Sequence, residues 1–409
     1  MSQENDRQLP DGWQWVKLGD VCKIVNGSTP SSTIEEYWNG DIIWITPTDL
    51  GKLSSSLITD AARKITKSGY QSCNTEIVPT NSVIISSRAP IGYIGIANIP
   101  LCTNQGCKSL VVTEKIDTWF LYFWLKLSIP VLKSIGKGTT FQEISKSQLT
   151  IFEIPLPPLS EQKRIAAILN EQMEAVEKAR KATEAQLEAA KALPAAYLRA
   201  VFESEEANSW ERRKLGDVCR VTKLAGFEYT KYVNYNPDGK YIALRAQNVR
   251  NTGLDLSNFV KITEDVASYL SRSKLDSGDI VMTFIGANIG EATWIDKNDM
   301  FYCAPNIARI TPNAELIDCQ FLTRLIHSSE FQRQIRDINE STAQQSLSMK
   351  NIRDFWVVFP TLSQQKQIAS TLTEQMQEVE RLKQNLKEQL DTINKLPAVL
   401  LRRAFKGEL

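Results

Sequence analysis

The sequence predicts an α+β protein in which two small β-rich domains alternate with two long helices that pair as an antiparallel coiled coil. Three observations lead to this prediction. The stretch 160–202 recurs without a gap as 363–405, and 19 of its 43 positions are identical in the two copies. The Trp-x-x-x-Lys-Leu-Gly-Asp-Val-Cys stretch at 13–22 recurs at 210–219, and short β-like runs fill the segments in between. The whole chain is therefore predicted to be a pseudo-twofold internal repeat.

Both copies of the longer stretch are predicted to be helices. Ser160 and Ser363 can cap their N-termini, and no glycine or proline follows until Pro194 and Pro397. We expect these prolines to end or bend the helices, because proline removes a backbone hydrogen bond and clashes with the preceding turn. An alternative is two separate amphipathic helices, each packed on its own domain. Apolar residues at heptad spacing form the predicted seam of the helix pair, namely Ile165, Leu169, Val176, Leu193, Ile368, Leu372, Val379, Leu382, Leu386, Ile393 and Leu396.

The repeat divides the chain into four predicted segments. A variable domain at 1–155 precedes a repeat helix at 156–206, and a second variable domain at 207–358 precedes the C-terminal repeat helix at 359–409. Each variable domain contains strand-like runs that enter glycine turns, and each closes with a helical stretch and a polar loop. Proline-containing connectors lead into both long helices. We expect each variable domain to be a small α+β unit.

Composition predicts a soluble cytoplasmic protein of more than one domain. The 409 residues are too many for a single core, and 42% of them are apolar while 23% are charged. Seven cysteines without a Cys-x-x-Cys pair indicate reduced thiols, and a single histidine argues against a histidine-ligated metal. The apolar run 119–132 is too short to span a bilayer and is better explained as a buried helix.

The order and doubling of these segments resemble the specificity subunit of a type I restriction-modification system. The resemblance covers essentially the whole chain. Its motifs are Ile-Pro-Leu-Pro-Pro-Leu-Ser-Glu-Gln at 154–162, Phe-Pro-Thr-Leu-Ser-Gln-Gln at 359–365, the two repeated starts, and the C-terminal stretch 401–409.

This resemblance implies that each variable domain is a target recognition domain reading one half of an asymmetric, interrupted sequence in double-stranded DNA. The helices would act as a spacer between the half-sites and as a dock for two modification subunits that methylate adenine at N6. Restriction subunits would complete an ATP-dependent translocating nuclease. The chain itself would have no catalytic residues and bind no metal or cofactor, while S-adenosylmethionine, ATP and Mg²⁺ would bind to the partner subunits.

Base-reading side chains are expected on loops, because arginine or lysine recognises guanine and asparagine or glutamine recognises adenine. For each candidate, a solvated or turn-capping role is the alternative. The candidates in the first domain are Arg88, Asn104, Gln105, Lys137, Thr139, Thr140 and Gln142. The candidates in the second domain are Arg245, Gln247, Asn248, Asn288, Asn306, Gln344 and Gln345.

The net charge of +1 counts against a protein that holds DNA by itself, since a basic face is the usual footprint of DNA binding. Partner subunits that close around the DNA would supply the missing phosphate contacts. The absence of a methyltransferase Asn/Asp-Pro-Pro-aromatic motif, a Gly-x-Gly-x-x-Gly motif and a P-loop favours a binding protein over an enzyme. Two alternatives remain open: a recognition subunit for a separate fused-type restriction-methyltransferase, and a coiled-coil scaffold that does not bind DNA.

Overall fold

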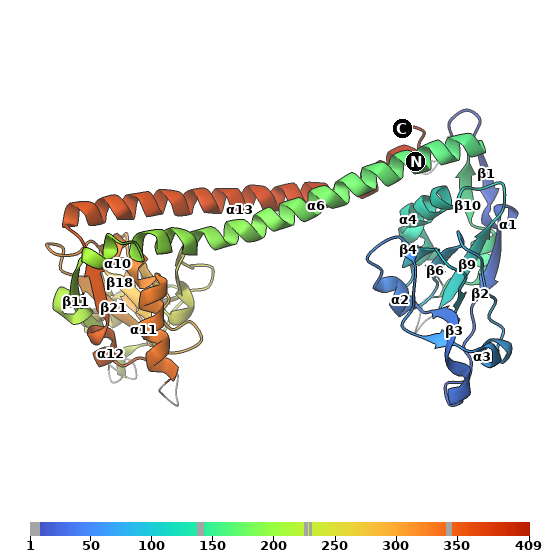
Figure 1. Ribbon diagram of the computed structural model, residues 1–409. Coiled ribbons are helices and arrows are strands. Elements are labelled where there is room, and N and C mark those ends of the chain that lie inside the picture. Colours follow the sequence, from blue (N-terminus) through green and yellow to red (C-terminus); the bar gives the residue numbers. More distant parts are fainter. Residues whose placement is uncertain (1–8, 137–142, 225–227, 229–230, 341–345) are drawn as a thin grey trace. The chain divides into compact units, whose positions relative to one another are not determined.

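The computed structural model describes residues 9–136, 143–224, 228, 231–340 and 346–409 (Figure 1). The chain divides into two compact units. Unit 1 comprises 1–183 with 389–409, and unit 2 comprises 184–388. Each long helix contributes to both units, so the four-segment division drawn from the sequence stays a prediction.

Unit 1 is built on two β-sheets. The larger sheet has the strand order β2 (Cys22–Asn26), β9 (Cys107–Val112), β6 (Val83–Ser86), β7 (Ile94–Ala97) and β4 (Leu57–Ile58). The smaller sheet has the order β5 (Lys64–Ile65), β3 (Trp38–Ile45) and β8 (Cys102–Thr103), and β1 (Gln14–Lys17) pairs separately with β10 (Glu153–Leu156). The helices of this unit are α1 (Leu18–Val21), α2 (Pro47–Gly51), α3 (Lys67–Gln71), α4 (Thr118–Ile135) and α5 (Lys146–Thr150).

Strand β6 separates two layers of core in unit 1. Alternate side chains of a strand point to opposite faces of its sheet. Val83 and Ile85 pack in the core that contains Phe120 of α4, whereas Ile84 packs with Ile45 of the smaller sheet. Helix α4 therefore covers one face of the larger sheet and the smaller sheet covers the other. The predicted buried helix in the apolar run 119–132 is confirmed as the middle of α4.

Unit 2 repeats this arrangement. Its first sheet has the order β12 (Cys219–Lys223), β21 (Ile307–Pro312), β18 (Ile280–Thr283) and β19 (Ala292–Trp294). Its second sheet has the order β16 (Val260–Ile262), β13 (Tyr241–Leu244), β20 (Phe301–Cys303) and β17 (Lys274–Leu275). The paired strands β14 (Val249–Arg250) with β15 (Gly253–Leu254) and β11 (Glu211–Lys214) with β22 (Trp356–Phe359) complete the unit.

Strand β18 separates two layers of core in unit 2, as β6 does in unit 1. Ile280 and Met282 pack in the core that contains Phe321, while Val281 packs with Leu244 of the second sheet. The helices of unit 2 are α7 (Leu215–Val218), α9 (Glu264–Tyr269), α10 (Cys319–Ile326), α11 (Ser329–Glu340) and α12 (Met349–Asp354). Figure 1 shows α10 and α11 beside β18 and β21. The two predicted α+β units thus share one layered plan.

The two long helices, α6 (Leu159–Phe202) and α13 (Leu362–Phe405), run antiparallel. In unit 1 the start of α6 shares a core with the end of α13, and the rings of Phe120 and Phe405 lie 5.0 Å apart there. In unit 2 the end of α6 shares a core with the start of α13, through Leu198 and Leu372. The predicted fold class is therefore confirmed, and the alternative of two unpaired helices is wrong.

Most of the predicted seam is buried or half-buried. The buried members are Ile165, Leu169, Leu372, Val379, Leu386 and Ile393, and the half-buried members are Val176, Leu193 and Ile368. Leu382 and Leu396 are wrong as seam residues, because they are 42% and 38% exposed. Two packed helices bury only a narrow stripe of each other. These leucines follow Val379 and Ile393 by three residues and lie at the edge of that stripe.

The ends of the long helices differ from the prediction. Both helices continue through Pro194 and Pro397 and are 44 residues long. Burial of Leu198 and Phe202 after the first proline offsets the cost of the missing backbone hydrogen bond. Both helices also begin one residue before the predicted capping serines, so those serines lie inside the first turn. Among the described residues, no helix has the length and apolar character needed to cross a bilayer.

Candidate nucleic-acid interface

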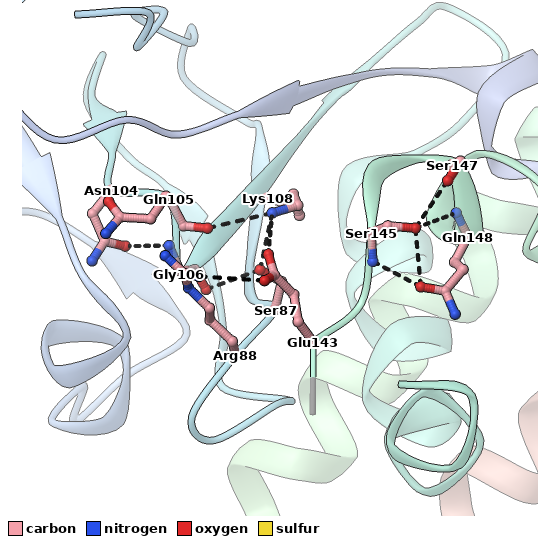
Figure 2. Close-up of polar contacts among 10 residues, drawn as sticks. All are labelled: Ser87, Arg88, Asn104, Gln105, Gly106, Lys108, Glu143, Ser145, Ser147 and Gln148. Atoms are coloured by element: carbon pink, nitrogen blue, oxygen red, sulfur yellow. Dashed lines mark hydrogen bonds and ion pairs between the residues drawn. The ribbon is translucent and has the colours of Figure 1, made fainter. Parts of the chain in front are cut away.

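Three loop segments of unit 1 meet where β6 ends and β9 begins. Ser87 donates its backbone N–H to the carbonyl of Gly106 at 2.7 Å, and Ile144 donates to the carbonyl of Ser87 at 3.0 Å. Arg88 and Glu143 form an isolated antiparallel bridge. The backbone therefore fixes the segments 87–88, 104–106 and 143–144 side by side (Figure 2).

A small charged cluster fills this junction, as Figure 2 shows. The Lys108 side chain is only 6% exposed, and its Nζ lies 3.4 Å from Glu143 Oε1 and 3.1 Å from Ser87 Oγ. Arg88 Nη1 lies 3.4 Å from the other carboxylate oxygen of Glu143. Glu143 thus holds two cations together, and the Arg88 side chain remains 38% exposed. A partly exposed guanidinium beside a loop edge has the donors that recognise guanine or phosphate.

The other two predicted loop residues of unit 1 lie next to this cluster. Asn104 Oδ1 accepts a hydrogen bond from the backbone N–H of Gly106 at 3.0 Å, and Gln105 accepts one from the Thr29 hydroxyl. Gln105 is exposed and Asn104 is half-buried. The structure therefore brings Arg88, Asn104 and Gln105 together on one surface. The candidates Lys137, Thr139, Thr140 and Gln142 lie outside the described residues.

Unit 2 builds the same junction. Phe284 donates its N–H to the carbonyl of Asn306 at 3.0 Å, and Leu347 donates to the carbonyl of Phe284 at 2.9 Å. An isolated bridge joins Ile285 and Ser346, as one joins Arg88 and Glu143 in unit 1. The hydrogen-bonding pattern places Phe284, Ile285 and Asn306 where unit 1 has Ser87, Arg88 and Gly106.

The side chains at the two junctions differ in chemistry. Ile285 is 37% exposed where unit 1 presents Arg88, and the buried Ala308 replaces the buried Lys108. Asn306 is exposed, as predicted for a loop residue, and its φ of 72° lies in the left-handed region that asparagine tolerates. One backbone framework thus presents charged side chains in unit 1 and the uncharged side chains of Ile285 and Asn306 at the matching positions in unit 2.

Three other candidates of unit 2 lie in the turn after β13. Asn248 is wrong as a base-reading residue, because it is 1% exposed and its Nδ2 donates to the carbonyls of Asp255 and Asn258 at 2.8 Å. Its Oδ1 accepts from the N–H of Arg245 at 3.0 Å, so the amide closes the loop. A turn-capping asparagine and a base-reading asparagine look alike in a sequence. Gln247 stays exposed and Arg245 half-buried beside this turn.

The remaining candidates of unit 2 are separated from that turn in the sequence. Asn288 is half-buried, and its carbonyl accepts the N–H of Glu291 at 3.1 Å in the loop before β19. Gln344 and Gln345 lie outside the described residues. Their roles in reading DNA remain predictions.

Sequence reasoning missed two residues of the charged junction, Lys108 and Glu143. The signal for Lys108 was a lysine in the run 107–112, which is apolar apart from Ser109 and in which a buried charge requires a partner. The sequence around position 143 has no feature that identifies Glu143 as that partner. In the described ranges, no group of three or more histidine, cysteine, aspartate and glutamate side chains could hold a metal ion.

The fold and these surfaces define an internally duplicated protein, in which one framework presents two unlike sets of side chains. A family described as "Type I restriction modification DNA specificity domain" matches residues 10–188 and 208–392. The chain belongs to this family, and the predicted resemblance is confirmed.

Curated relatives and a solved structure are similar to this chain. The type I restriction enzyme MjaIX specificity subunit of Methanocaldococcus jannaschii is 34% identical over 229 residues, which cover 52% of this chain and 53% of that protein. This match spans about half of that relative. The MjaVIII specificity subunit of the same organism is 24% identical over 95% of this chain and 91% of its own. The crystal structure of the HsdS subunit from Thermoanaerobacter tengcongensis has the same fold, with a TM-score of 0.66, 19% identity and 98% of both chains covered.

Proposed function

We propose that this chain is the DNA-specificity subunit of a type I restriction-modification complex, and that each unit reads one half of a bipartite, asymmetric target. One observation carries the proposal. The hydrogen-bonded junction at the end of the main sheet is the same in both units, but it presents Arg88 in one and Ile285 in the other. A shared framework with unlike side chains is what two readers of different half-sites require, because specificity depends on the groups that face the base edges.

The helices support a docking and spacing role in this proposal. Helix α13 exposes Leu382, Leu396 and Val399, which are 42%, 38% and 45% accessible. Large exposed apolar residues on a helix are suited to contact a partner helix. The proposed partners are two modification subunits, which would methylate adenine at N6, together with restriction subunits.

The proposed partner subunits would carry out the methylation and the ATP-dependent reactions. S-adenosylmethionine would bind to the modification subunits, and ATP with Mg²⁺ would bind to the restriction subunits. This chain would act without a catalytic residue of its own, in the cytoplasm. The near-neutral charge fits a subunit whose partners supply many of the phosphate contacts.

The experiment is to co-express this chain with a type I modification subunit from the same organism and to map N6-methyladenine across the genome by single-molecule sequencing. We expect a new bipartite motif that disappears when this chain is omitted. A soluble, stable complex that produces no motif would contradict the proposal and favour the scaffold alternative.

A further inference from the structure

Unit 2 contains a cavity of about 860 Å³ between its helices and the edge of its first sheet. Its walls include Leu198 of α6, Trp294 of β19 and Met376 of α13. The lining is mainly apolar, and the volume lies in the range of small-molecule sites. None of the residues that line this cavity belongs to the loop junction described above.

Arg324 of α10 is the unusual residue of this cavity. It is only 8% exposed, and its one side-chain hydrogen bond within the described residues is a long one of 3.4 Å to Thr373 Oγ1. Its buried Nε has no partner in that part of the chain. The guanidinium carbon lies 5.2 Å from the centre of the Trp294 ring, which offsets part of the cost of burying the charge. Burial lowers the pKa of Arg324, but an arginine remains protonated in proteins.

The internal repeat shows that the fold does not require a cation at this position. Asp117 and Asp318 each donate a backbone N–H, at 2.8 Å, to a buried glutamine of the following long helix. These matched bonds align α4 with α10 and place Phe123 at the position of Arg324. Phe123 is 2% exposed and packs in the apolar core of unit 1. An apolar side chain therefore satisfies the packing, and the buried charge of unit 2 needs another explanation.

We propose that this cavity binds a small organic monocarboxylate, with the carboxylate on Arg324 and an aromatic or aliphatic body against Trp294 and Met376. A guanidinium pairs with a carboxylate through two parallel hydrogen bonds, and within the described residues the terminal nitrogens of Arg324 make only the long bond to Thr373.

Arg324 is the buried one of the charged lining residues, whereas Arg199, Glu380 and Arg381 are exposed. A single anionic charge therefore fits the buried part of the cavity better than a phosphate dianion. His327 also lines the cavity, and burial lowers its pKa to about 4, so its ring is neutral at pH 7.

The test uses 4-phenylbutyrate as the probe and its uncharged amide, 4-phenylbutyramide, as the matched control. Isothermal titration of the full chain is expected to show the acid binding at least tenfold more tightly than the amide. The Arg324→Met variant is expected to lose this preference, whereas Arg324→Lys keeps part of it. Equal binding of acid and amide to the unmodified chain, or an unchanged preference in Arg324→Met, would overturn the proposal.

A second measurement does not depend on how the variants fold. Crystals of the unmodified chain soaked with 4-iodobenzoate are expected to show an anomalous iodine peak in this cavity, with the carboxylate at Arg324. Iodine only at other places on the molecule would overturn the proposal.

The Arg324→Phe variant, which copies the residue of unit 1, serves as a folding control and is expected to melt at or above the melting temperature of the unmodified chain.

Discussion

His327 is the one histidine of the chain, and it directly follows helix α10. Its Nε2 lies 2.7 Å from the carbonyl oxygen of Ala292, so the neutral ring donates a hydrogen bond to β19. Burial lowers the pKa of His327 from 6.5 to about 4. Between these two values the unfolded chain binds a proton that the folded chain does not bind. Stability therefore falls as the pH drops from 6.5 towards 4.

We expect the free energy of unfolding to fall by about 1.3 kcal/mol between pH 7.5 and pH 5.5 through this residue alone. His327→Gln should remove that pH dependence, because glutamine can still donate to Ala292 but does not ionise. Urea unfolding of both proteins at the two pH values provides the measurement. Since no other histidine is present, equal pH dependence in the two proteins would mean that the His327 ring is not held neutral.

At the scale of elements, the first turn of each long helix is fixed by one buried glutamine. Gln365 is fully buried, donates to the carbonyls of Leu316 and Pro360 at 3.0 and 2.9 Å, and accepts from the N–H of Asp318 at 2.8 Å. Gln162 makes the corresponding three bonds in unit 1. The glutamine thus ties the start of the long helix both to its proline connector and to the N-cap residue of α4 in unit 1 or α10 in unit 2.

Replacing Gln162 with leucine should destabilise the chain by about 3 kcal/mol. The substitution removes the partner of two carbonyl groups and one N–H, of which the Pro157 carbonyl is buried and the other two groups are part-buried, and a group left without a partner costs up to about 1–3 kcal/mol before relaxation. The neighbouring Lys163 is exposed, so Lys163→Ala is the matched control and should change stability by less than about 0.5 kcal/mol. Chemical unfolding gives both values. Similar effects of the two substitutions would show that the glutamine does not hold the helix.

These glutamines also show what the sequence could reveal about the elements. Gln162 and Gln365 are identical, lie at the same place in a gapless repeat, and follow a proline connector, so the repeat predicted the position of both helices. Their pairing was predicted from the apolar residues at heptad spacing. The edge of the seam was not predictable. Leu382 keeps heptad spacing but is exposed, because the burial of such a residue depends on how much surface the neighbouring helix covers. Heptad spacing alone does not predict how much of a residue's surface the neighbouring helix covers.

For the whole molecule, duplication was visible in the sequence, but the composition of each binding surface was not. Arg88 and Gln105 could be proposed because they are polar residues beside predicted strand ends. Lys108 and Glu143 are 35 residues apart and meet only through the bridge that closes the junction. Asn248 was predicted as a base-reading residue because it lies in a loop, but it is a buried structural residue. Contacts between distant segments decide which polar side chains face outwards.

The duplicated framework allows a test of whether the two units read DNA independently. The triple variant Arg88→Ile, Lys108→Ala and Glu143→Ser gives unit 1 the residues that unit 2 has at the same framework positions. Under the proposed function, we expect the methylated motif to change or relax in one half only. Loss of a specific arginine contact to a base costs about 1–3 kcal/mol, so discrimination in that half should fall roughly fivefold or more.

The reciprocal variant Ile285→Arg in unit 2 should alter the opposite half of the motif and leave the first half unchanged. Methylome sequencing of cells that co-express each variant with the methyltransferase measures both effects, and melting temperatures of the purified variants separate misfolding from altered reading. Independent reading requires that each variant change a different half, because each junction is closed by backbone hydrogen bonds within its own unit. A folded variant that changes both halves together, or neither half, would show that this junction does not face the bases.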